Sequence, residues 1–271
     1  MLVFIHISKT GGTTVTYILR STFGPGHCQV EPWHDKLKEP PFSSDDLQRL
    51  RKIYPNLQSI AGHRIKGHVD LHDNGTEFKY FTFMRDPLKR HASYYQFKAQ
   101  ERGLKDNFEE WVVKSEWSHN RQTRSIASVV DANEAIRIIQ EKNIFIGLTD
   151  RFDESMVLLK ALRAKNLNIS YKRIQVAPRN TIAQSLLSTE RTRQMFVDAN
   201  RADLELYDYV THELYPAYQR AYGPSLEADV AEYRRTQNHN FNYWNLTMAR
   251  LKQYSLYRPL LYLNRKGVRV L

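Results

Sequence analysis

The residues with the clearest capacity for chemistry stand near the amino terminus. An apolar run, Leu2 to Ile7, leads directly into a short loop with one lysine and two adjacent glycines. Adjacent glycines let the backbone turn tightly with several N–H groups facing one point, and a helix that follows adds its unpaired N–H donors. The residues that would form this cradle are Lys9, Thr10, Gly11, Gly12, Thr13 and Thr14. The pattern predicts a binding site for a phosphate-like anion.

The order of these residues distinguishes the loop from a Walker A motif. In Walker A the lysine follows the glycines in the order Gly-x-x-x-x-Gly-Lys-[Ser/Thr], whereas Lys9 precedes Gly11 and Gly12. The sequence therefore disfavours an ordinary nucleoside triphosphatase. Taken alone, the loop is also compatible with an ordinary strand-to-helix turn, in which the glycines provide the required backbone conformation and bind no ligand.

A second strand-turn-helix pattern begins with the strand-like, largely apolar residues 79–84 and continues into Arg85, Asp86 and Pro87. Pro87 suits the first position of a helix and Asp86 suits its cap, which leaves Arg85 at the carboxyl end of the strand, where open α/β sheets bind ligands. Ser93 lies eight positions after Arg85, so both can reach one phosphate only if the chain folds back at the Asp-Pro corner. A guanidinium and a hydroxyl suit a terminal phosphate, while an ion pair between Arg85 and Asp86 is the alternative.

Together, these two motifs resemble those of the sulfotransferases that use 3′-phosphoadenosine-5′-phosphosulfate (PAPS, with 3′-phosphoadenosine 5′-phosphate, PAP, as product). The likeness is greatest to the carbohydrate branch, which includes heparan sulfate 2-O-sulfotransferase and bacterial relatives. The resemblance implies that residues 9–14 hold the 5′-phosphosulfate and that Arg85 and Ser93 hold the 3′-phosphate. Weaker similarities follow at residues 120–124 and 146–155, so the likeness extends in order to about Tyr222. Ser8 stands where the family commonly has proline, a change that removes no phosphate donor.

The reaction needs a base for the acceptor hydroxyl, and two Gly-His pairs, ending at His63 and His68, lie between the phosphate motifs. Imidazole suits this role because its ordinary pKa lies near neutral pH, so the neutral ring can take a proton. The resemblance also implies a Gly-His ahead of the Arg-Asp-Pro. His63, 22 positions before Arg85, fits that arrangement best, and His68 is the second candidate. No metal is expected, because Cys28 and the histidines lack ligand spacing.

The mechanism expected from this resemblance is in-line transfer. Sulfuryl transfer gives the protein little covalent work, so positioning and stabilisation of charge on the departing phosphate must supply the rate. Lys9 is the natural cation for that oxygen. A sulfuryl group carries one negative charge, which is compatible with backbone donors and a lysine acting without Mg²⁺.

Strand-like stretches at Leu57 to Ala61, Tyr80 to Met84 and Asn143 to Leu148 alternate with helix-like stretches. This alternation predicts an α/β fold with a P-loop-like parallel sheet flanked by helices and a mostly helical C-terminal segment. The length of 271 residues suits one large α/β domain or such a domain with an appendage. The resemblance implies a sulfotransferase catalytic domain over residues 1–222, followed by a basic, aromatic extension over residues 223–271. The proline-containing segment from Gly24 to Ser44 is interpreted as a long loop.

The C-terminal extension is unusually basic. From Tyr233 to Leu271 it has eight Lys or Arg and no Asp or Glu, so it carries +8 of the formal charge of +11. It predicts a surface for an anionic acceptor or an anionic membrane, or else a charged helix that packs through its tyrosines. Specific nucleic-acid binding is disfavoured because no such motif is present.

The expected activity is transfer of a sulfuryl group from PAPS to a hydroxyl, with a saccharide or glycoconjugate as acceptor. Two alternatives remain open at this point: another nucleotide-binding transferase such as a small-molecule kinase, and a non-catalytic binder of nucleic acid or an anionic surface. No run of eighteen apolar residues is present, so no membrane-spanning segment is predicted. The expected compartment is the cytoplasm for a full-length bacterial chain and the Golgi lumen for a trimmed eukaryotic one.

Overall fold

A parallel β-sheet forms the centre of the molecule in the computed structural model, which describes residues 1–31, 40–171, 181–237, 239–266 and 268. Within these residues the sheet has five strands in the order β2-β3-β1-β4-β5, all parallel. The strands are β1 (Leu2–Ile5), β2 (His27–Gln29), β3 (Ser59–Gly62), β4 (Lys79–Met84) and β5 (Phe145–Leu148). All five carboxyl ends therefore meet at one edge of the sheet, and the predicted parallel α/β fold is confirmed.

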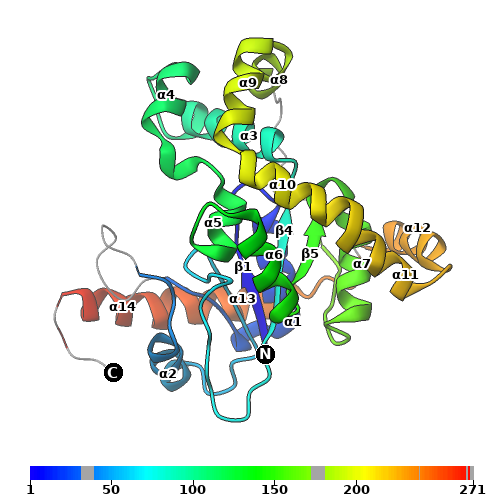
Figure 1. Cartoon of the computed structure of the whole chain (residues 1–271). Coiled ribbons are helices and arrows are strands. Elements are labelled where there is room, and N and C mark those ends of the chain that lie inside the picture. The colour runs from blue at the N-terminus through cyan, green and yellow to red at the C-terminus, as the bar shows by residue number, and fades with distance from the viewer. Residues whose placement is uncertain (32–39, 172–180, 238, 267, 269–271) are drawn as a thin grey trace.

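Helices cover both faces of this sheet (Figure 1). Helices α5 (Arg121–Ala127) and α6 (Ala132–Glu141) lie on one face, and α1 (Gly12–Phe23) and α13 (Tyr243–Lys252) lie on the other. Every residue of β1 and β5 is buried. Strands that are buried on both sides need continuous apolar sequence rather than alternation, which is why the sequence signalled these strands as unbroken apolar runs.

The other helices extend this core at both ends. A lobe formed by α3, α4, α8 and α9 stands apart from the sheet and has its own apolar cluster, which includes Tyr95, Trp111 and Phe196 (Figure 1). The bounds of the remaining helices are α2 (Ser44–Ile53), α3 (Pro87–Glu101), α4 (Phe108–Lys114), α7 (Phe152–Leu162), α8 (Thr181–Ser188), α9 (Glu190–Ala199), α10 (Arg201–Tyr209), α11 (Tyr215–Tyr222), α12 (Leu226–Thr236) and α14 (Arg258–Arg265).

The segment from Gly24 to Ser44, interpreted above as a loop, contains the edge strand β2. The strand has only three residues, and Cys28 is the only buried apolar residue of the three. The sequence therefore lacks the hydrophobic pattern from which a strand could be predicted here. The strand forms because β3 supplies its backbone partners. Residues 32–39 of the same segment lie outside the described residues.

The C-terminal helices close the outer edge of β2. Helix α13 continues through a π-helical turn, Gln253–Tyr257, into α14. The Gln253 side chain accepts from the Gln29 N–H at 3.2 Å and donates to the Gln29 carbonyl at 2.8 Å. The Tyr257 hydroxyl lies 3.1 Å from both the N–H and the carbonyl oxygen of Glu31. These side chains satisfy backbone groups that an edge strand otherwise leaves unpaired.

None of the helices within the described residues is both long and apolar enough to cross a membrane.

Candidate active site

The loop after β1 has the backbone geometry of an anion cradle. Lys9 and Gly11 both have positive φ, 68° and 82°, and α1 begins immediately after them at Gly12. Left-handed residues at the start of a helix turn successive N–H groups toward the same side, where the free N–H groups of the first turn also point. No acidic residue lies in that first turn. The loop is therefore suited to hold an anion.

The side chains of the loop divide into structural and open groups. Thr10 is fully buried, and its hydroxyl donates to the Ile7 carbonyl at 3.0 Å, so it shapes the turn and contributes only its backbone to a ligand. Thr13 and Thr14 are half-buried in the first turn of α1. Gly12 has no room for a side chain, because a Cβ there would lie 2.0 Å from Nε2 of His6. The second glycine is thus required by close packing against a histidine.

Lys9 reaches from this loop to helix α3. Its Nζ lies 4.8 Å from the centre of the Phe97 ring, a cation–π contact. Burial lowers the pKa of Lys9 from its ordinary value, the Arg85 charge lowers it further, and Glu101 opposes both effects. Two cations, Lys9 and Arg85, therefore act on each other beside the cradle, which is the electrostatic condition that an anion relieves.

Arg85 is held at the end of β4 through its backbone. Its N–H donates to Oε1 of Gln122 at 3.0 Å, and Nε2 of Gln122 donates back to its carbonyl at 2.9 Å. The side chain is half-buried, and its Nε is buried without a hydrogen-bond partner. Desolvation lowers the pKa of Arg85 even though Asp150 and Asp86 act in the opposite direction. A buried guanidinium donor without a partner is the feature that a bound phosphate would satisfy.

The structure does not form the ion pair between Arg85 and Asp86 that the sequence left as the alternative. Asp86 caps α3 by accepting from the Lys89 N–H at 2.8 Å, and Lys89 forms its ion pair with Asp150 at 3.0 Å. Among the described residues, no ion pair within 4.0 Å joins Arg85 to either carboxylate. Pro87 opens α3 as the sequence predicted.

Ser93 lies on the side of α3 that faces the loop. It is half-buried and stands four residues before Phe97, the ring that Lys9 contacts. Residues four apart occupy one face of a helix, so Ser93 lies one turn closer than Phe97 to the amino end of α3 and to Arg85. Ser93 therefore shares a helical face with the residue that Lys9 contacts.

His63 follows β3 and lies against the same loop. Its Nδ1 is 2.7 Å from the His6 carbonyl oxygen, and the two imidazole rings stack with centres 4.1 Å apart. A carbonyl only accepts, so Nδ1 carries the hydrogen and Nε2 keeps its lone pair. The His63 side chain is exposed at the surface, but protein groups surround it on several sides. The resulting desolvation lowers its pKa, and this effect is larger than the opposite effect of the hydrogen bond to His6. The ring is therefore neutral near pH 7, with Nε2 available as a base.

His68 occupies a different environment, against helix α5. The preceding Gly67 donates to the Ser125 carbonyl at 3.1 Å, and a Cβ on Gly67 would lie 2.8 Å from the Ile126 carbonyl oxygen. Nδ1 of His68 is buried, and burial lowers the pKa of the ring. The structure brings His63, and not His68, into contact with the segment that carries the cradle.

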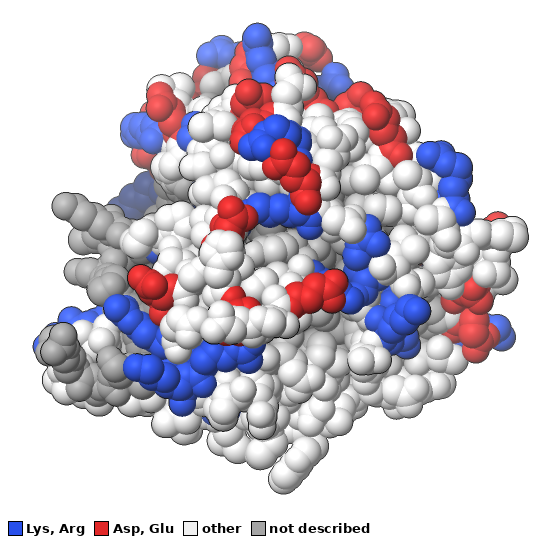
Figure 2. All heavy atoms as spheres, turned by 60° about the horizontal axis from the view of Figure 1, so that its bottom comes forward, with Lys and Arg blue, Asp and Glu red and all other residues white. Residues whose placement is uncertain are grey.

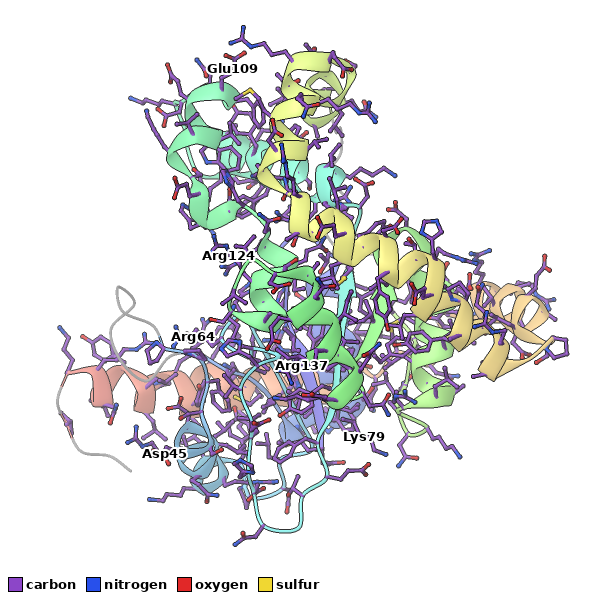
Figure 3. The ribbon with its side chains drawn as sticks, in the orientation of Figure 1. Asp45, Arg64, Lys79, Glu109, Arg124 and Arg137 are labelled. Carbon is purple, nitrogen blue, oxygen red and sulfur yellow. The ribbon has the colours of Figure 1, made fainter. Side chains whose placement is uncertain are left out.

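A cluster of basic side chains borders His63. It comprises Arg64, Lys66, Arg121 and Arg124. Desolvation together with Arg121 and Arg64 lowers the pKa of Lys66 to about 8, and Arg121 also lowers the pKa of His63. Arg64 and Arg124 come from different segments yet extend on the same side of the molecule in Figure 3. The repulsion within this cluster predicts a site for negative charge beside the candidate base.

A cavity of about 680 Å³ opens on the other side of the cradle. Gly11 and Thr14 line it from the loop, and Phe152, Tyr171 and Arg234 line it from elsewhere in the chain. The Phe152 and Tyr171 rings meet edge to face at 5.2 Å, and Arg234 is fixed by Asp153 at 3.1 Å. An aromatic wall beside an anion cradle suits the base of a nucleotide whose phosphate occupies the loop.

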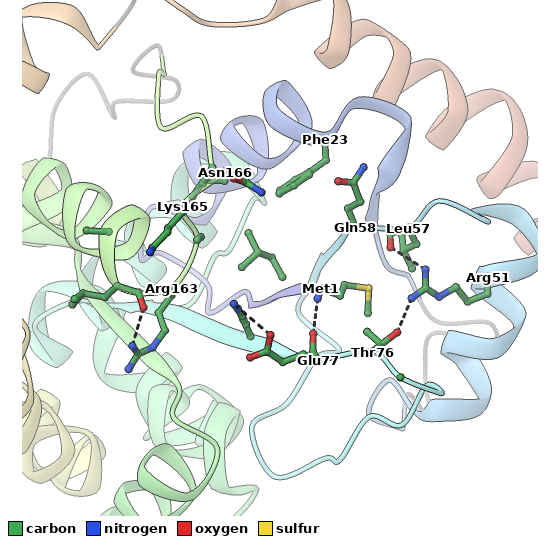
Figure 4. Close-up of a pocket in the computed structure, with 17 residues that line it drawn as sticks. Met1, Phe23, Arg51, Leu57, Gln58, Thr76, Glu77, Arg163, Lys165 and Asn166 are labelled. Atoms are coloured by element: carbon green, nitrogen blue, oxygen red, sulfur yellow. Dashed lines mark hydrogen bonds and ion pairs between the residues drawn. The ribbon is translucent and has the colours of Figure 1, made fainter.

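A second cavity, of about 710 Å³, lies at the opposite edge of the sheet (Figure 4). Its lining includes Met1, Leu2 and Lys79, which begin β1 and β4. The Met1 amino group donates to the Glu77 carbonyl there, and Arg51 donates to the Leu57 carbonyl at 2.9 Å. This cavity is separated by the length of the strands from the residues described above.

Sequence reasoning missed the residues that fix this arrangement. Asp203 on α10 accepts from the backbone N–H groups of Gln122 and Thr123 at 3.1 and 2.7 Å, which holds the start of α5 and thereby Gln122 against Arg85. The Thr149 hydroxyl lies 3.1 Å from the Thr10 carbonyl oxygen and 3.0 Å from that of Met84, so it joins the loop to β4. The similarities noted at residues 120–124 and 146–149 were the available signal for both.

Fold and site together define an α/β protein whose central strand leads into an anion-binding loop. Residues 1–210 match the family model described as Sulfotransferase family, and the chain belongs to that family. It is accordingly a transferase that moves sulfuryl groups. A search of curated proteins finds no significant match.

Proposed function

We propose that this protein transfers the sulfuryl group of PAPS to a hydroxyl of a saccharide. The observation that carries the proposal is the convergence of the loop N–H groups, Lys9 and the unpartnered Nε of Arg85 at the carboxyl edge of the sheet. A donor with phosphates at both its 5′ and 3′ positions matches two separate cationic sites. The aromatic cavity beside Gly11 supplies room for its adenine.

In this proposal each residue has a defined task. The donor, when bound, supplies an activated sulfuryl group on a phosphate leaving group. His63 Nε2 accepts the proton of the acceptor hydroxyl as its oxygen bonds to sulfur. Lys9 and the N–H groups of residues 11–14 stabilise the negative charge that develops on the departing phosphate oxygen when its bond to sulfur breaks. Arg85 and Ser93 hold the 3′-phosphate and so fix the donor in line with His63.

The basic cluster beside His63 supports an acceptor that carries negative charge. Lys66 and Arg121 are the members whose charges act on His63, so the acceptor's anionic groups would lie close to the hydroxyl that reacts. A saccharide with carboxylate or sulfate substituents meets that condition. Turnover of an acidic oligosaccharide should then exceed that of its neutral counterpart, and Lys66→Gln should reduce the difference.

The donor assignment is tested by calorimetric titration. Adenosine 3′,5′-bisphosphate should bind more tightly than 5′-AMP or ATP, and Arg85→Ala should remove most of the preference over 5′-AMP, because a lost charged hydrogen bond costs about 1.5–3 kcal/mol. Arg137→Ala is the matched control, since that arginine forms ion pairs with Glu134 and Glu141 on α6. Equal affinity for the two adenosine phosphates would show that the 3′-phosphate is not read.

A further inference from the structure

The C-terminal helix presents an outward side that the fold does not use. Residues 243–265 run through α13, the π-helical turn and α14 without interruption, about 35 Å at 1.5 Å per residue. The inward side is buried and includes Gln253 and Tyr257, which close the β2 edge. The inward side therefore supplies the buried contacts that hold this helix to the sheet.

The outward side carries several large apolar side chains among its polar ones. Trp244 is 71% exposed and Tyr262 is 60% exposed. Trp244 and Leu251 are seven residues apart on α13, and Arg258 and Tyr262 are four residues apart on α14, so each pair lies on one face of its helix. Other large exposed apolar side chains on these helices are Tyr243, Tyr254, Leu256 and Leu263. An exposed apolar patch of this extent marks a surface that another body covers.

Basic residues predominate beside these exposed side chains, and the half-exposed Arg258 also forms an ion pair with Glu31 at 2.8 Å. No Asp or Glu occurs from Tyr233 to the end of the chain. Arg258 lies 4.4 Å from the centre of the Tyr254 ring, and Lys266 lies 5.8 Å from that of Tyr262, so cations flank the exposed aromatics. Figure 2 shows Lys and Arg gathered at the lower left of the face it presents, with some Asp and Glu beside them. Large aromatic and aliphatic side chains with basic residues beside them are the composition of helices that lie in the headgroup region of a bilayer.

We propose that the outward side of α13–α14 docks the protein onto a membrane surface rich in anionic lipid. A second copy of the chain is a poorer partner, because a symmetric contact would set two basic helices against each other, and Glu31, the carboxylate beside them, is already paired with Arg258 of its own chain. An anionic polysaccharide would match the cations but leave Leu251 and Trp244 without apolar contact. A bilayer satisfies both, with the rings and leucines among the acyl chains and the basic groups at the phosphates.

The test uses the full-length protein and vesicles of phosphatidylcholine alone or mixed equally with phosphatidylserine. Sedimentation with the vesicles should show binding to the mixed vesicles that weakens as salt rises. Trp244→Gln/Leu251→Gln/Tyr262→Gln should lower the partition coefficient by about a hundredfold or more, and Arg258→Gln/Lys266→Gln by about tenfold. Trp117→Gln is the matched control, because Trp117 is 51% exposed and lies in the lobe of α3 and α4.

A second readout is the fluorescence of Trp244. Tryptophan emission of the wild-type protein should shift to shorter wavelength with mixed vesicles, and lipids brominated along the acyl chain should quench it. The same measurements on the Trp244→Phe protein should show neither effect.

Three outcomes would overturn the proposal: the wild-type protein does not bind mixed vesicles, the triple variant binds them as the wild type does, or sedimentation velocity shows a dimer that the triple variant abolishes. Donor affinity serves as the check on the active site, since it should be unchanged in every one of these variants.

Discussion

His63 donates its Nδ1 hydrogen to the His6 carbonyl oxygen across 2.7 Å while its ring stacks on the His6 ring. This single contact fixes the tautomer and the plane of His63 and joins the end of β3 to the end of β1. The candidate base and the loop that starts three residues after His6 are thus one rigid arrangement, provided by adjacent strands of the sheet.

We expect His63→Ala to lower kcat by about 10²–10⁴ and to leave the affinity for adenosine 3′,5′-bisphosphate unchanged, because the ring acts on the acceptor's proton and not on the donor. Steady-state kinetics and calorimetry measure the two quantities. His68→Ala is the control, because His68 lies against α5. If His68→Ala abolishes turnover and His63→Ala does not, the two roles must be exchanged.

The pH dependence of turnover follows from the lowered pKa of His63. A base works only when it is deprotonated, so kcat/KM should rise with pH through the pKa of this ring and then level off. Because desolvation lowers that pKa from 6.5, the midpoint of the acid limb should lie below pH 6.5. A midpoint above pH 7 would contradict the assignment of His63.

Gln122 should act as a positioning residue for Arg85. Gln122→Leu removes both hydrogen bonds to the Arg85 backbone and leaves a buried N–H and a buried carbonyl without partners. We expect the KM for the donor to rise by about tenfold or more, with a smaller change in kcat. Gln140→Leu is the comparison, since Gln140 bonds Tyr209 at the surface. Loss of thermal stability without a change in KM would indicate a structural role alone.

Acid should destabilise the fold through its buried histidines. His27 is fully buried beside the Ser59 hydroxyl, and burial lowers its pKa to about 3. The unfolded chain binds a proton near pH 6.5 and the folded chain does not, so stability is full above pH 6.5 and falls as the pH drops toward 3. Urea unfolding between pH 7 and pH 5 should show a loss of up to about 1.4 kcal/mol per pH unit from this residue. His27→Gln should make the slope shallower, and an unchanged slope would exclude this cause.

The sequence by itself determined the central architecture, because its strongest signals are local. Residues 2–7, 79–84 and 143–148 are short stretches dominated by branched and aromatic apolar residues, which suffice to predict buried parallel strands. The glycine pair and Pro87 also act locally, through backbone conformation, and they mark where α1 and α3 begin. The C-terminal tyrosines were recognised as packing candidates, and Tyr257 is fully buried.

Only the tertiary structure decided how the site is supported. Gln122 contacts Arg85 across 37 positions, and Thr149 contacts Thr10 across 139, and no local pattern reports pairs so distant. The position of His63 also depends on strand order, because β3 lies beside β1 and so brings His63 to the His6 carbonyl. Likewise, β2 is a strand because β3 supplies its backbone partners, and Gln253 covers it from the far end of the chain. The sequence gives the number of charged residues in the C-terminal helix. Which of its residues are exposed, Trp244 and Tyr262 among them, depends on how the opposite side of the helix packs against the rest of the protein.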